Sequence, residues 1–124
     1  MRVVSNTTPL RYLIAIEYEH LLGKLFEKVF VPLAVHEELT HARTPEPVRR
    51  RVLLLPNWYE IRTVQEPQTA TFPVVLHRGE REAILLAEAL HTDAILIDEQ
   101  VGRSIAISRN LPLLGTLGDR KSVV

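Results

Sequence analysis

Two carboxylates in this chain occupy positions at which the hydrophobic pattern favours apolar side chains. If a helix begins near Gly79, Glu82 projects into the middle of a broad apolar arc, whereas Glu80 falls toward its margin, as a solvated charge should. Asp98 ends the apolar run 94–97, which is typical of a strand buried on both faces of a parallel sheet. Glu82 and Asp98 are therefore the first candidates for a functional site.

Two further oxygen donors lie near predicted element ends. Asn6 follows a short first strand at 3–4, and Glu38 lies on the flank of the buried face of a predicted helix over 33–42, with Glu37 on the opposite side. Carboxylates brought together need a neutralising cation or a shared proton. Oxygen-only ligands suit a hard divalent ion such as Mg²⁺ or Mn²⁺, which activates water for in-line attack on phosphorus. The candidate metal site consists of Asn6, Glu38, Glu82 and Asp98.

Each of these residues also has a purely structural interpretation. Glu82 lies in the first turn of its helix, where the macrodipole favours an acid. Asp98 is a suitable N-cap for a predicted helix over 100–109. Glu38 is by itself an ordinary flank residue, and Asn6 is by itself a common turn residue or cap. The functional interpretation depends on their convergence at one edge of one sheet.

The order of predicted elements indicates a three-layer α/β/α domain with a mostly parallel central sheet, because strands alternate with helices. In such sheets ligands bind beyond the C-terminal ends of the strands. Asn6 and Asp98 therefore share a crevice if their strands are neighbours. The predicted strands cover 3–4, 29–31, 58–61, 94–97 and 112–115, and the predicted helices cover 10–16, 21–26, 33–42, 47–55, a segment from 79, and 100–109.

Composition limits the class of protein. A chain of 124 residues with 46% hydrophobic content fits one domain with one core. It contains no cysteine, which excludes disulfide scaffolds and thiolate metal sites and fits a cytoplasmic protein. We expect neither a membrane span nor a signal peptide. The formal net charge is zero, so any contact with nucleic acid must come from a local patch.

Five motifs in register cover nearly the whole chain, and they are Val4–Leu10, Val31–Leu39, Gly79–Ile84, Leu96–Arg103 and Gly115–Gly118. They resemble the PIN-like nuclease superfamily, and more narrowly a small prokaryotic branch of mostly unknown function. The resemblance implies one PIN-like domain over 1–118 and a disordered tail over 119–124, although members of this branch usually continue with further helices.

The resemblance implies a metal-dependent endoribonuclease that hydrolyses RNA phosphodiesters, often as the toxin of a toxin/antitoxin pair. In such enzymes the acids hold one or two Mg²⁺ or Mn²⁺ ions, and a metal-bound water attacks the RNA. The acids of the family match the four candidate residues already selected, with Glu80 and Glu99 as substitutes for their neighbours.

Asn6 departs from the family pattern, which usually has aspartate there. An amide oxygen ligates a metal without adding negative charge, so we expect weaker metal binding and reduced or absent cleavage. The alternative function is therefore a catalytically inactive PIN-like module that binds RNA or a protein partner. A nucleotide-binding domain is disfavoured because no glycine-rich phosphate loop follows a predicted strand.

Partners follow from the same resemblance. PIN-like proteins commonly form homodimers, and the apolar helices at 10–16 and 21–26 are candidate contacts. An antitoxin protein is a second expected partner. The phosphates of RNA require cationic side chains near the acids. Arginines in such positions are, however, often solvated helix residues with no binding role. The candidate RNA-binding residues are Arg11, Arg78, Arg81 and Arg103.

Overall fold

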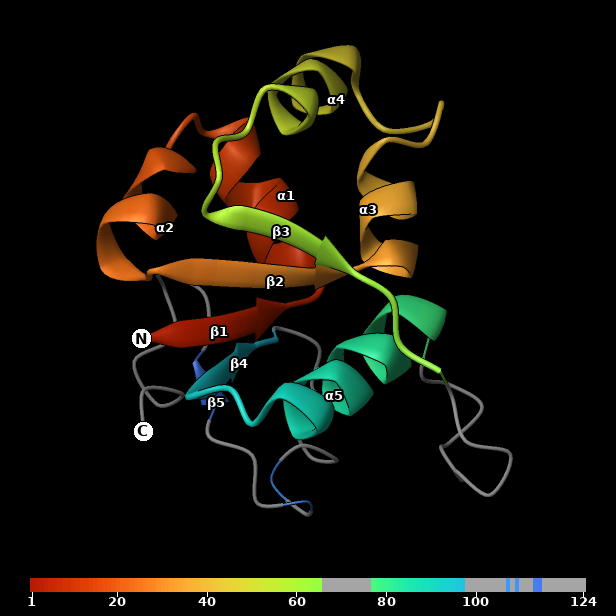
Figure 1. Cartoon of the computed structure of the whole chain (residues 1–124). Helices are drawn as coiled ribbons and strands as arrows, with labels where there is room; N and C mark the ends of the chain where they lie inside the picture. The colour runs from red at the N-terminus through yellow and green to blue at the C-terminus, as the bar shows by residue number, and fades with distance from the viewer. Residues whose placement is uncertain (66–76, 98–106, 108, 110–112, 115–124) are drawn as a thin grey trace.

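A parallel sheet forms the centre of the fold in the computed structural model, which describes residues 1–65, 77–97, 107, 109 and 113–114 (Figure 1). The described strands lie in the order β3-β2-β1-β4-β5, and all paired neighbours are parallel. The predicted parallel sheet is therefore confirmed. The strands are β1 (Arg2–Ser5), β2 (Lys28–Pro32), β3 (Tyr59–Arg62), β4 (Ala94–Leu96) and β5 (Leu113–Leu114).

Helices cover both faces of the sheet, which confirms the predicted three layers. Successive strand residues point to opposite faces. Val3 accordingly packs in one cluster with Leu10 of α1, and Val4 packs in another with Ile84 of α5. Figure 1 shows α5 on the opposite side of the sheet from α1, α2 and α4. The helices are α1 (Thr7–Ala15), α2 (His20–Leu25), α3 (Leu33–Leu39), α4 (Glu46–Leu53) and α5 (Arg78–Leu90).

The order in which the chain adds strands to the sheet reverses between β1 and β4. From β1 the chain adds β2 and then β3 on one side, and it returns through α5 to place β4 on the other side of β1. Ser5 pairs with Leu96, and the backbone N–H of Asn6 donates to the Leu96 carbonyl at 3.1 Å. The two strands are therefore neighbours, which is the condition on which the shared crevice depends. Open parallel sheets bind ligands at such a switch point.

The helix predicted over 33–42 is shorter in the structure. It ends at Leu39, and Ala42 is exposed rather than on the buried face. The buried Thr44 donates its hydroxyl to the Glu38 carbonyl at 2.7 Å. That bond satisfies a carbonyl of the last helical turn, which has no partner within the helix.

A side-chain hydrogen bond joins α3 to β3 at the edge of the sheet. Nδ1 of His36 lies 2.7 Å from the hydroxyl of Tyr59 in β3. Burial raises the pKa of Tyr59. Burial lowers the pKa of His36 below its ordinary value, with the charge of Glu37 acting in the opposite direction. Both side chains therefore favour their neutral forms in the folded protein.

Some predicted elements lie outside the described residues. These are the tail over 119–124 and the helix over 100–109, of which only residues 107 and 109 are described. None of the helices in the described ranges is long and apolar enough to span a bilayer.

Candidate functional site

Asn6 lies where β1 ends and α1 begins. Its side chain is buried, with 1% of the residue exposed. It occupies the N-cap position of α1 but forms no capping hydrogen bond with that helix. Capping therefore does not account for an asparagine at this position. The other predicted residue of this edge, Asp98, lies outside the described residues, as do Glu99 and Arg103.

An open cavity of about 490 Å³ lies directly beyond β1. Its walls come from the start of α1, from α3 and from the start of α5. We call it the acidic cavity because two carboxylates, Glu38 and Glu80, line it together with Asn6. The complete lining is Asn6, Thr7, Thr8, Arg11, Tyr12, Ala15, Glu38, His77 and Glu80.

Glu38 reaches the acidic cavity from the exposed side of α3. Its Oε2 accepts a hydrogen bond of 2.8 Å from the Thr7 hydroxyl. Its Oε1 lies against Gly79, where a Cβ atom would approach that oxygen to 2.6 Å. A glycine at the start of α5 thus permits the close approach of the two helices. The sequence analysis missed this role of Gly79, although its place at the head of the predicted helix was visible.

Glu80 differs from its predicted position. We expected a solvated charge at the margin of the helix, but only 6% of Glu80 is exposed, and it lines the acidic cavity. The helical wheel describes packing against the sheet alone, whereas α3 also covers the first turn of α5. His77, a further residue that the sequence analysis missed, has its Nε2 4.0 Å from Oε1 of Glu80.

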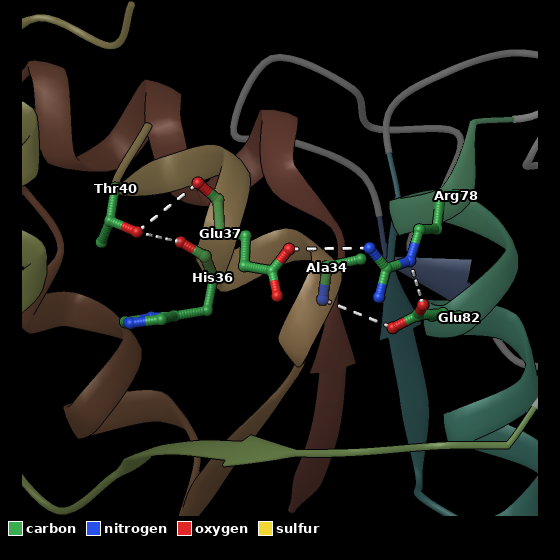
Figure 2. A network of polar contacts seen from close by, with 6 residues as sticks. All are labelled: Ala34, His36, Glu37, Thr40, Arg78 and Glu82. Carbon is green, nitrogen blue, oxygen red and sulfur yellow. Dashed lines mark hydrogen bonds and ion pairs between the residues drawn. The ribbon is translucent and has the colours of Figure 1, made fainter. Parts of the chain in front are cut away.

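Glu82 is buried as predicted, with 7% of the residue exposed. Its carboxylate faces α3 rather than the acidic cavity (Figure 2). Oε1 accepts the backbone N–H of Ala34 at 3.3 Å, and Oε2 accepts Nε of Arg78 at 2.7 Å. Arg78 also pairs with Glu37 at 3.6 Å. Glu82 therefore supplies an acceptor to the N-terminus of a neighbouring helix and joins α5 to α3.

A second open cavity, of about 510 Å³, lies beside the acidic cavity. We call it the arginine cavity. It shares Thr7, Arg11 and Glu38 with the acidic cavity. Of the predicted RNA-binding residues, Arg11 and Arg78 line it, whereas Arg81 lines neither cavity. Its complete lining is Thr7, Arg11, Ala34, Glu37, Glu38, His41, Arg43, Thr44 and Arg78.

The donors in the acidic cavity fit a hard cation. Asn6, Glu38 and Glu80 offer amide and carboxylate oxygens, which Mg²⁺ and Mn²⁺ prefer. Within the described ranges, no group of three or more acidic, histidine or cysteine side chains is placed to hold an ion. The described residues therefore place two acids and one amide along one cavity without completing a metal site among themselves.

A comparison with protein families identifies the fold. A model of the PIN domain family DUF3368 matches residues 2–118. The chain belongs to this PIN domain family. PIN domains form a nuclease-type superfamily whose members generally use divalent metal ions. No curated protein gives a significant match to the chain.

Proposed function

We propose that this PIN domain is a metal-dependent endoribonuclease that hydrolyses RNA phosphodiesters in the acidic cavity. One observation carries the proposal: Asn6, Glu38 and Glu80 come from three separate chain segments and line one cavity at the switch point of the sheet. Asp98, which follows β4, is the proposed third acid, with Glu99 as its substitute. The family membership supports nuclease chemistry as the class of reaction.

The residues of the cavity have distinct roles in this proposal. A bound Mg²⁺ or Mn²⁺ ion would supply an activated water and stabilise the charge that develops on phosphorus. Glu38 and Glu80 hold that ion, and the Thr7 hydroxyl fixes the orientation of Glu38. Asn6 contributes an oxygen without charge, so its contribution to cation affinity is smaller than that of an aspartate.

Glu82 was predicted from the sequence as a metal ligand, and we now propose that it is a positioning residue. Both of its carboxylate oxygens bind donors between α3 and α5. These helices carry Glu38 and Glu80. By fixing one helix against the other, Glu82 maintains the separation of the two acids.

The second candidate function is a PIN module that binds RNA or a protein partner without cleaving RNA. The neutral Asn6 in the lining of the cavity favours this alternative. Membership of the PIN family supports RNA as the ligand and a toxin/antitoxin pairing. The homodimer, the antitoxin partner and the cytoplasmic location remain predictions.

One set of variants separates the two functions. Mn²⁺ binding by calorimetry and cleavage of a labelled single-stranded RNA are measured for the wild type, Asn6→Asp, Glu80→Gln and the control Glu88→Gln. The control lies on the same helix, away from the acidic cavity. We expect Asn6→Asp to bind Mn²⁺ more tightly and cleave faster, Glu80→Gln to lose both properties, and the control to match the wild type.

The outcomes distinguish the hypotheses. If neither the wild type nor Asn6→Asp binds Mn²⁺, the metal-dependent nuclease hypothesis is wrong. If both bind RNA and neither cleaves it, the inactive module is the correct interpretation. If Glu80→Gln retains metal binding and cleavage, the assignment of Glu80 is wrong.

A further inference from the structure

The arginine cavity continues the acidic cavity across a shared wall. Thr7, Arg11 and Glu38 line both cavities, and the volumes are similar, about 490 and 510 Å³. The arginine cavity is therefore the neighbouring site for the next unit of a polymer whose reacting group sits in the acidic cavity. The chemistry of that site depends on the charges that line the arginine cavity.

Cations outnumber acids around the arginine cavity. Arg11, Arg43 and Arg78 line it, against Glu37 and Glu38. The carboxylate of Glu37 lies 3.6 Å from Arg78, which also pairs with an acid of α5. Neither Arg11 nor Arg43 forms an ion pair with any described residue. Two exposed guanidinium groups are therefore available for an anionic ligand.

The position of Arg43 is fixed relative to the acidic cavity. The backbone N–H of Arg43 donates to Nδ1 of His41 at 3.0 Å. The next residue, Thr44, is 6% exposed and donates its hydroxyl to the Glu38 carbonyl at 2.7 Å. The turn that carries Arg43 is thus hydrogen-bonded to Glu38, which lines both cavities.

We propose that the arginine cavity binds the backbone phosphate next to the cleaved one in single-stranded RNA, through Arg43 and Arg11. This inference rests on the proposed function, because it places the reacting phosphate in the acidic cavity. Guanidinium groups bind phosphate oxygens with two parallel hydrogen bonds. Phosphate contacts fix the register of a strand without reading its bases. The cavity therefore positions RNA irrespective of its sequence.

Binding in the absence of metal tests the inference separately from cleavage. Fluorescence anisotropy of a labelled single-stranded RNA is measured in EDTA over a range of NaCl concentrations. We expect Arg43→Gln to weaken binding several-fold for RNAs of different sequence. The slope of log K against log salt should fall by about 0.7 for one lost phosphate contact on a single strand. Glu37→Gln, which removes an acid from the cavity, should strengthen binding.

The matched control is Arg50→Gln. Arg50 is an exposed arginine of α4 that pairs with Glu46 and lines neither cavity. The Arg50→Gln variant should leave both the affinity for RNA and the slope of log K against log salt unchanged. An equal loss in Arg50→Gln and Arg43→Gln would mean diffuse attraction, and would overturn the assignment to this cavity.

Cleavage kinetics distinguish failure of this inference from failure of the proposed function. If the wild type cleaves RNA and Arg43→Gln raises KM with kcat unchanged, the phosphate site and the nuclease function are both supported. If cleavage occurs but Arg43→Gln alters neither binding nor KM, the phosphate site is wrong and the nuclease stands. If no cleavage occurs but binding depends on Arg43, the phosphate contact stands and the nuclease is wrong.

Discussion

Replacing Glu82 by glutamine tests whether this carboxylate joins α5 to α3. The variant keeps the shape of the side chain but places an amide NH₂ against one of two donors, the Ala34 N–H and the Arg78 guanidinium. A hydrogen bond to a charged group contributes about 1.5–3 kcal/mol. Because the Arg78 side chain is 57% exposed, solvent screening reduces the contribution of its hydrogen bond with Glu82 to stability. We expect Glu82→Gln to lower the free energy of unfolding by about 2 kcal/mol.

Urea denaturation measures this change. With an m value of about 1.5 kcal/mol/M, such a loss lowers the midpoint by roughly 1.3 M at unchanged m. The control Glu88→Gln removes a carboxylate from the same helix, and the Glu88 side chain is 33% exposed against 10% for Glu82. This control should change stability by less than about 0.5 kcal/mol.

A double-mutant cycle with Arg78→Gln isolates the ion pair, and we expect a coupling of about 1 kcal/mol. The reasoning is refuted if Glu82→Gln unfolds at the wild-type urea concentration and also loses Mn²⁺ binding. That result would make Glu82 a metal ligand, as the sequence first predicted, rather than a positioning residue.

Three further predictions concern other contacts of the described residues. Gly79→Ala places a Cβ 2.6 Å from Oε1 of Glu38, so we expect Mn²⁺ affinity to fall several-fold in a calorimetric titration; wild-type affinity would contradict this. Gly23→Ala places a Cβ 2.4 Å from Cδ1 of Trp58, so we expect a loss of about 1–3 kcal/mol and altered fluorescence of this single tryptophan; an unchanged emission spectrum would contradict the contact. Burial lowers the pKa of His36, so the unfolded chain binds a proton more readily; the free energy of unfolding should fall as pH drops below about 6.5, and His36→Gln should reduce that dependence in urea melts from pH 7 to 5.

The sequence predicted the layers of the fold because its strands and helices have clear periodicity. The apolar pair Val3–Val4 in β1 and the buried run that contains β4 identified the two strands whose C-terminal ends form the switch point. It also predicted that Glu82 is buried, because the residue interrupts an apolar arc. These features depend on local pattern, which a single sequence records directly.

The partners of the buried acids could not be predicted in the same way. Whether Glu80 or Glu82 faces the cavity depends on how α3 crosses the first turn of α5, which is a tertiary contact. Arg43 joins the arginine cavity only because Thr44 bonds back to the end of α3. A helical wheel treats one element at a time, so it carries no information about a neighbouring helix.

The acidic cavity draws its side chains from the first, third and fifth described helices and from Asn6 and His77, which directly precede two of them. During synthesis, a chain that ends before α5 already contains Asn6 and Glu38 but lacks Glu80 and also Gly79, against which Glu38 packs. Contacts between such distant segments form late, because long loops must close first. Under the proposed function, an emerging chain is therefore unable to cut the messenger from which it is being translated.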